Sequence, residues 1–231
     1  MEIPVLYEDN HLLVLDKPAG LATMGLPEGH PTLLTWAKEY IRQRYHKPGN
    51  VYLGVVSRLD VPVSGVVLLA RTSKAASRLS EQFRRHLCRK RYWAILGGVP
   101  KTPEGELRHW IVHDKRFRRV HIEHAPTPLG REARLRYRTL AVEGRRALVE
   151  IELITGRKHQ IRAQFAAIGH PIVGDLKYGS RESFPVGIAL HGRWLTVVHP
   201  TKKEEQTFVA APPKSWDAFR HLWRGAIEES P

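Results

Sequence analysis

The chain has 231 residues, enough for one large domain or two closely joined subdomains, and a core of that size folds without disulfides or structural metals. Its single cysteine, Cys88, cannot form an internal disulfide, and neither a secretion signal nor a membrane-spanning apolar stretch is visible. We therefore expect a cytoplasmic protein with no membrane partner. The 37 Lys and Arg outnumber the 23 Asp and Glu by a net charge of +14, which favours a polyanionic partner over a basic but inert surface.

Short β-type runs dominate the sequence, and three helical segments interrupt them. The runs are Leu12–Leu15, Val51–Val56, Val66–Ala70, Tyr92–Leu96, Leu107–Val112, Leu135–Leu140, Ala147–Leu153, Ile188–Val198 and Gln206–Val209. The predicted helices cover residues 32–45, 73–87 and 157–168, and the second has an apolar stripe of Ala76, Leu79, Phe83 and Leu87. The pattern predicts an α+β fold: a mixed, largely antiparallel sheet, a few flanking helices and a central catalytic cleft. We expect one catalytic domain over residues 1–231, or two closely joined subdomains that meet at the cleft.

A loop is predicted over residues 57–65, because Pro62 and Gly65 interrupt two apolar runs there. If the extended backbone lasts to Asp60, alternation places Arg58 and Asp60 on one face and Leu59 on the other. A carboxylate beside a cation is a candidate catalytic group. An Asp near Pro and Gly also commonly caps a turn, so the local sequence leaves that structural role open.

A second segment, residues 151–168, is predicted to be a strand that runs into a helix with Ile161, Phe165 and Ile168 buried. Arg157, Lys158 and Arg162 place positive charge on the first two turns, where each cation costs about 0.3–1 kcal/mol against the helix dipole. A carboxylate from elsewhere in the chain, or an RNA phosphate, would compensate. A solvated and screened helix end is the alternative.

Two other groups of basic residues have aromatic neighbours. Arg84, Arg85, Arg89, Lys90 and Arg91 precede Tyr92 and Trp93, and Lys115, Arg116, Arg118 and Arg119 surround Phe117. Cations hold phosphates and rings stack on bases, so both groups favour RNA. Tyr92 by itself is typical of a strand residue in a core or on a sheet surface. The histidines His109, His113, His121 and His124 follow no compact ligand spacing, so we predict no metal site.

Several blocks resemble, in order, the RluA-type family of pseudouridine synthases. They are Lys17-Pro18-Ala19-Gly20, Arg58-Leu59-Asp60 with Ser64-Gly65, Arg91-Tyr92-Trp93-Ala94, residues 155–162 (TGRKHQIR), residues 169–175 (GHPIVGD) with Tyr178-Gly179, and Leu190-His191, Leu195 and His199-Pro200. The resemblance spans about residues 12 to 210. It implies the pseudouridine synthase fold and an enzyme, an isomerase, that converts uridine to pseudouridine in RNA without a cofactor.

The family's roles, carried to matching positions, make Asp60 the nucleophile, Tyr92 the general base and an aromatic contact to the target base, and Arg162 the partner of the Asp60 carboxylate. A paired arginine would keep a buried carboxylate charged. Tyr92 could remove a proton from C5 or from the sugar, and the sequence leaves both open. Ser57 and Val63 depart from the family's common His and Thr, which puts the orientation of the loop and the choice of target in doubt.

The target base must leave its stack to react, at a cost of a few kcal/mol. Arg58 is predicted to contact the backbone or to fill the vacated space. Because the first block begins by residue 12, we expect no N-terminal RNA-binding module and expect recognition by the catalytic domain itself. The candidate RNA-binding residues are Arg58, Arg84, Arg85, Arg89, Lys90, Lys115, Arg116, Arg118, Arg119, Arg157 and Lys158. We expect a monomer that acts on a compact stem-loop of tRNA or rRNA, with no DNA partner.

Two other classes of protein remain as alternatives. The first is an RNA-binding or ribosome-assembly protein that has lost turnover, although the presence of Asp60, Tyr92 and Arg162 argues against it. The second is a hydrolase that uses Asp60 with another carboxylate. Its obvious second acids, Glu150 and Glu152, look more like one solvated face of a strand.

Overall fold

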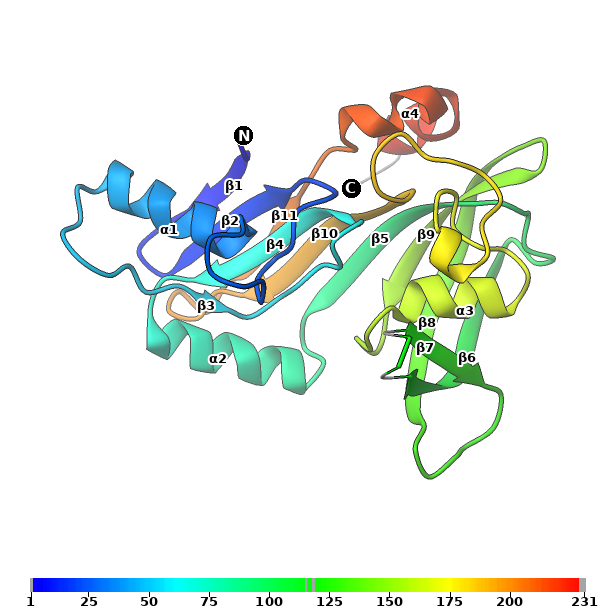
Figure 1. Cartoon of the computed structure of the whole chain (residues 1–231), viewed down its shortest axis with the longest axis horizontal. Coiled ribbons are helices and arrows are strands. Elements are labelled where there is room, and N and C mark those ends of the chain that lie inside the picture. Colours follow the sequence, from blue (N-terminus) through cyan, green and yellow to red (C-terminus); the bar gives the residue numbers. More distant parts are fainter. Residues whose placement is uncertain (1, 115, 118, 229–231) are drawn as a thin grey trace. The chain divides into compact units, whose positions relative to one another are not determined.

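The computed structural model describes residues 2–114, 116–117 and 119–228 (Figure 1). The chain forms two compact units. The first comprises residues 1–90 and 192–211, and the second comprises residues 91–191 and 212–231. Lys115 and Arg118, which the sequence predicts to bind RNA, lie outside the described residues.

The first unit is built around β2 and β4, two strands that are buried on both faces. β2 (Leu12–Lys17) pairs antiparallel with β1 (Val5–Glu8) and with β4 (Ser64–Ala70), which β3 (Gly54–Val55) also joins. β11 (Glu205–Val209) pairs antiparallel with β10 (Leu190–Val198). Helices α1 (Leu33–Arg44) and α2 (Ser73–Arg84) belong to the same unit.

Each helix packs on its own face of the β2–β4 pair (Figure 1). Leu13 and Leu15 of β2 pack in one cluster with α1, whereas Leu12 and Val14 pack in another with α2. Successive side chains of a strand point to opposite faces, so a strand covered on both faces must be apolar throughout. This accounts for the unbroken apolar runs in the sequence.

The second unit is an antiparallel sheet with helices of its own. Its strands pair in the order β5 (Arg89–Leu96), β9 (Arg146–Leu153), β8 (Arg131–Glu143), β6 (Glu104–Asp114) and β7 (Arg119–Glu123). The helical elements are α3 (Gln160–Ala167), α4 (Arg220–Glu228) and the short 3-10 turns η1 (Leu176–Tyr178) and η2 (Lys214–Phe219). Ala163 of α3 packs with Ile111, Val120 and Ala133, so α3 covers one face of this sheet.

The predicted α+β fold with a largely antiparallel sheet is confirmed, and some details of the prediction are wrong. Only Gly54–Val55 of the run Val51–Val56 joins the sheet, whereas Val51 and Leu53 pack in the core with α1 without joining it. Leu87 is not part of the buried stripe of α2. The helix ends at Arg84, the chain turns at His86 with φ 55°, and the Leu87 side chain is 57% exposed. β1, β7 and α4 were not predicted.

Gly65 is a position where the fold admits no side chain. It has φ +122°, and a Cβ placed there would lie 2.2 Å from the carbonyl oxygen of Gly192 in β10. We predict that Gly65→Ala lowers the free energy of unfolding by about 3–5 kcal/mol, because strain at positive φ adds to a backbone clash. Urea denaturation measures the change. The control is Gly49→Ala in the same unit, which has φ +81° with no atom within 4 Å and should cost only about 1 kcal/mol. Equal costs for the two variants would contradict the clash.

Candidate functional site

Asp60 lies on the loop between β3 and β4, where the sequence predicts a loop. Thr23 holds the preceding residue, since its hydroxyl donates to the Leu59 carbonyl at 3.0 Å and accepts from the Leu59 N–H at 3.3 Å. The Val63 N–H donates to the Asp60 backbone carbonyl at 3.1 Å and closes a turn that begins at Asp60. Leu59 packs against the α1 core, Arg58 is exposed and Asp60 is half-buried. The backbone on both sides of Asp60 is therefore fixed.

Ser57, the departure from the family's common histidine, has a structural role. Its hydroxyl accepts a hydrogen bond from the Leu68 N–H of β4 at 2.8 Å. Leu68 is the residue of β4 next to Leu69, where the pairing with β3 ends. The side chain of Ser57 thus replaces a strand partner. This contact fixes where the loop that carries Asp60 begins.

Lys17 is a buried cation beneath the same loop, and the sequence analysis assigned it no role. Its side chain is fully buried, and its ammonium group donates to the carbonyls of Pro18 at 2.8 Å, Leu21 at 2.7 Å and Val61 at 3.3 Å. The Gly20 N–H donates to the same Val61 carbonyl at 2.8 Å. The turn that begins at Lys17 and the loop that carries Asp60 are therefore joined through one buried ammonium group.

The charges around Lys17 balance one another. Burial lowers the pKa of Lys17 to about 8, against the opposing attraction of Asp60 and Asp16. Burial raises the pKa of Asp16 to about 6, against the opposing attraction of Arg193 and Lys17. Burial also lowers the pKa of Arg193, and Asp16 opposes that shift. Lys17 and Asp16 are both mainly charged at pH 7, so Asp60 belongs to a group of two acids and two bases that also contains Arg193.

Arg162 lies in the first turn of α3, and its side chain is buried. Its Nε donates to Asp175 Oδ2 at 2.6 Å and its Nη2 donates to Asp175 Oδ1 at 2.9 Å, a bidentate ion pair. Its guanidinium carbon lies 5.0 Å from the centre of the Tyr178 ring. Asp175 is thus a carboxylate from elsewhere in the chain that compensates the charge of Arg162, and it lies within the same unit. The pairing of Arg162 with Asp60 stays a prediction.

The helix that carries Arg162 is shorter than predicted, because α3 begins at Gln160 and not at Arg157. His159 precedes it with φ 53°, and the Gln160 side chain accepts hydrogen bonds from the Arg157 N–H at 2.9 Å and the Thr155 hydroxyl at 2.8 Å. These contacts hold residues 155–159 as a loop. Arg157 and Lys158 therefore lie before the helix and do not load its first turn with charge, and Ile168 is only half-buried.

Tyr92 lies on β5, opposite Ile151 of β9, and is half-buried. Its neighbour Trp93 is fully buried. Because alternate residues of a strand point to opposite faces, Tyr92 lies on the face opposite the Trp93 indole.

The predicted RNA-binding residues of the first unit differ in their surroundings. Arg84, Arg85 and Arg89 are exposed, although Arg84 pairs with Glu81 and Arg89 with Glu205. Lys90 is half-buried with its ammonium nitrogen 5.9 Å from the centre of the Phe83 ring, and burial lowers its pKa. Lys90 is therefore less available to a phosphate than the arginines around it.

In the second unit, two predicted RNA-binding residues lie close to an exposed ring. Arg116 and Arg119 place their guanidinium carbons 5.2 and 5.4 Å from the centre of the Phe117 ring, which is 57% exposed. Lys158 is exposed, whereas Arg157 is half-buried and its Nε donates to the Glu132 carbonyl at 3.0 Å.

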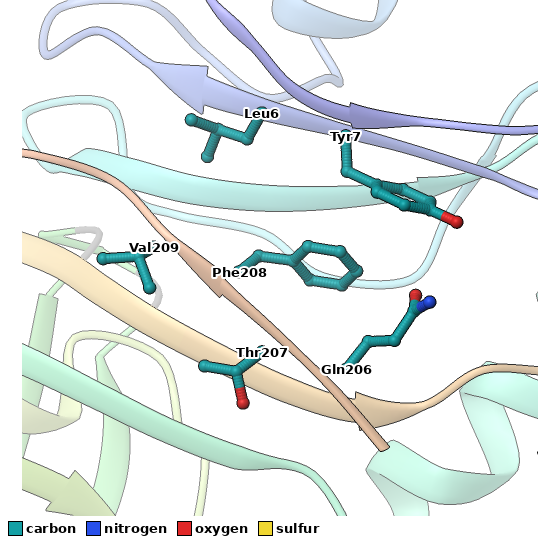
Figure 2. A pocket seen from close by; sticks show the side chains of 6 residues that line it. All are labelled: Leu6, Tyr7, Gln206, Thr207, Phe208 and Val209. Carbon is teal, nitrogen blue, oxygen red and sulfur yellow. The ribbon is translucent and has the colours of Figure 1, made fainter. Parts of the chain in front are cut away.

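A hollow of about 440 Å³ lies elsewhere in the first unit, between β1 and β11 (Figure 2). It is lined by Leu6, Tyr7, Gln206, Thr207, Phe208 and Val209. None of these is a predicted site residue, and the lining has no carboxylate or cation for the predicted chemistry. Among the described residues, no three His, Cys, Asp or Glu side chains group as a metal ligand set, and no described helix has the length and apolar character to cross a membrane.

Comparison with known proteins agrees with the resemblance in the sequence. Residues 11–167 match the model of the RNA pseudouridylate synthase family. The chain belongs to this family. It is an isomerase that converts uridine to pseudouridine in RNA, so the enzyme predicted from the sequence is confirmed.

The synthase is similar over most of its length to the dual-specificity RNA pseudouridine synthase RluA of Escherichia coli K12. The two are 33% identical, over 89% of this chain and 91% of that protein. It is 34% identical to the uncharacterized RNA pseudouridine synthases slr1629 of Synechocystis and YhcT of Bacillus subtilis, covering 67% and 66% of their lengths. Among solved structures, human RNA Pseudouridylate Synthase Domain Containing 4 superposes with a TM-score of 0.80 at 25% identity, over 95% of this chain and 92% of that one.

Three residues of the synthase gain a structural role that the sequence analysis did not give them: Lys17, Asp175 and Tyr178. All three lie in blocks that carry the family resemblance. Lys17 is the last residue of β2, which begins with an apolar run buried on both faces, and a lysine at such a position would have indicated a buried cation. No comparable local signal links Asp175 or Tyr178 to Arg162, because these contacts depend on how the chain folds back.

We predict that Lys17→Met lowers the free energy of unfolding by about 2–4 kcal/mol, because buried carbonyl groups lose their shared donor. Urea denaturation followed by circular dichroism measures the change. The control is Lys47→Met, an exposed position in the same unit, which should change stability by less than about 0.5 kcal/mol. A loss at Lys17 no larger than at Lys47 would show that the buried ammonium group does not hold the loop.

Proposed function

We propose that this synthase isomerises specific uridines in a compact stem-loop of tRNA or rRNA, with Asp60 as the nucleophile. It acts in the cytoplasm as a monomer and needs no cofactor. Tyr92 is the general base and Arg162 is the partner of the Asp60 carboxylate. One observation carries the assignment of Asp60: the loop is held on both sides of this residue, by Thr23 at Leu59 and by Lys17 and Gly20 at Val61. A fixed backbone with a half-buried carboxylate suits a nucleophile better than an ordinary surface turn.

The reaction needs only groups that this chain contains. The bond from N1 of uracil to C1′ of the ribose breaks, the uracil turns, and a bond from C5 to C1′ forms. A carboxylate that attacks C1′ holds the ribose while the uracil turns, and it leaves when C5 attacks. C5 then loses its proton and N1 gains one, so no atom is added and nothing is oxidised. This balance is the chemical reason for expecting no cofactor.

In this proposal, exposed cations of the synthase bind the RNA. Arg116 and Arg119 flank an exposed aromatic ring, which offers phosphate contacts and a stacking surface at one place. Arg84, Arg85 and Arg89 offer a second set on the first unit. The net charge of +14 supports a polyanionic substrate of this kind.

Glu150, one of the two candidate second acids of a hydrolase, lies among cations. Glu150 lies 3.7 Å from Arg138 and 3.9 Å from Arg91, and these cations also lie on the strands that flank β9. Glu150 is thus already engaged by two cations of the protein, which disfavours it as the second acid of a hydrolase.

We predict that Asp60→Asn lowers turnover by at least about 10³-fold, because an amide of nearly the same shape cannot act as the nucleophile. The assay measures tritium release from total RNA that carries 5-³H-uridine and comes from a strain lacking the enzyme. Asp217→Asn, an exposed matched change, should keep wild-type turnover. Tritium release by Asp60→Asn at the wild-type rate would exclude Asp60 as the nucleophile. Mapping the pseudouridines missing from the same strain identifies the substrate.

We predict that Arg116→Ala/Arg119→Ala weakens RNA binding and flattens its salt dependence by roughly 1.4–1.8 in the slope of log K against log salt concentration, because each phosphate contact contributes about 0.7–0.9. Filter binding over a series of salt concentrations measures both effects. The control is Arg220→Ala/Arg224→Ala, which removes two exposed charges from α4 of the same unit. If both double variants change the slope equally, the effect reflects net charge and not a contact of the Phe117 cluster.

A further inference from the structure

Tyr178 lies where several functional elements of the second unit meet. It is the last residue of η1, and its ring packs with the cluster of Ile111, Val120, Ala133 and Ala163. Its hydroxyl is 2.8 Å from His159 Nδ1, in a contact whose donor depends on the tautomer of His159. One side chain therefore contacts the sheet, α3 and the residue that precedes α3.

The ring of Tyr178 supports Arg162. The Arg162 guanidinium carbon lies 5.0 Å from the ring centre, and the same guanidinium is held in its plane by two hydrogen bonds to Asp175. A planar cation bonded at its edge and packed on a ring at its face has little freedom to rotate. The position of the ring thus contributes directly to the position of Arg162.

The hydroxyl of Tyr178 extends this support to β7. It accepts a hydrogen bond from the N–H of Val120 at 3.1 Å, and Val120 is buried. β7 forms an antiparallel hairpin with β6, and the turn of this hairpin carries Arg116 and Phe117. A displacement of the hairpin would therefore move the hydroxyl, and with it the ring that lies against Arg162.

We infer that Tyr178 is a positioning residue that couples the β6–β7 hairpin to Arg162. RNA bound to the hairpin fixes β7, the Val120 N–H fixes the Tyr178 hydroxyl, and the ring fixes the guanidinium. The inference rests on the proposed function, because it takes Arg162 as catalytic and the hairpin as an RNA contact. A hydroxyl that serves stability alone would bond in the same way but would not affect turnover.

The first test is Tyr178→Phe, which removes the hydroxyl and keeps the ring. Turnover is measured by tritium release from 5-³H-uridine-labelled RNA of the deletion strain, at a temperature where circular dichroism shows the variant to be folded. We expect kcat to fall about tenfold with KM changed less than about twofold, because a misplaced catalytic group affects the chemical step more than binding. A kcat within twofold of wild type would overturn the inference.

The matched control is Tyr137→Phe. Tyr137 is buried on β8 of the same unit, its hydroxyl bonds to that of Thr102 at 3.0 Å, and its ring contacts Phe165 of α3. Removing this hydroxyl changes stability without touching the link to Arg162. We expect wild-type kcat for this variant, and an equal loss of kcat in both variants would reduce the role of Tyr178 to stability.

A second measurement does not depend on activity. The ¹⁵N–¹H signal of Arg162 Nε, identified by its loss in Arg162→Lys, reports how well the guanidinium is held. We expect this proton to exchange with solvent about tenfold faster in Tyr178→Phe than in wild type or Tyr137→Phe. Unchanged exchange would overturn the inference even if kcat falls. If Asp60→Asn stays active, the proposed function fails by itself, and the exchange rate alone still decides the role of Tyr178.

Discussion

The Asp60 loop depends on one buried charge, the Lys17 ammonium group. An unpaired ammonium in a protein core is strongly unfavourable, and Lys17 avoids this cost through three backbone carbonyls and the attraction of Asp16 and Asp60. Because Lys17 pairs with Gly65 across β2 and β4, the same position anchors both the turn that follows β2 and the loop that precedes β4. Gly65 must lack a side chain there, because the backbone of Gly192 passes beside it. Strand register and buried charge together define the path of the loop.

The second unit also contains a buried cation that needs a partner, Arg162. A cation in the first turn of a helix opposes the helix dipole, and a bidentate carboxylate offsets that cost. Asp175 is available because residues 172–180 fold around it, with the N–H groups of Tyr178 and Ser180 donating to its carbonyl at 3.0 Å. The turn that presents the carboxylate therefore also presents the Tyr178 ring. In this way the family block from Gly169 to Gly179 acts as the partner of the block that contains Arg162.

Much of this could be predicted from the sequence, and the failures have physical causes. Apolar runs such as Leu12–Leu15 predict strands because burial on two faces leaves an unbroken pattern. α3 was placed too early, because propensity does not reveal that the Gln160 side chain bonds back to Thr155 and Arg157. The need of Arg162 for an anion was correctly inferred, but local sequence could not identify Asp175. A contact between residues 13 positions apart, on α3 and in the turn that follows it, depends on tertiary folding.

Buried and exposed charges have different roles in this protein: the buried ones position side chains, and the exposed ones are proposed to bind RNA. Within the described residues, the buried charged side chains are Lys17, Arg162, Arg193 and Asp175, which together contribute only +2. Most of the net charge of +14 is therefore carried by more exposed residues. Buried charges are weakly screened and fix geometry, whereas exposed charges act over about one Debye length and depend on salt. Under the proposed function, exposed arginines that bind RNA could therefore change without disturbing the groups that hold Asp60 and Arg162.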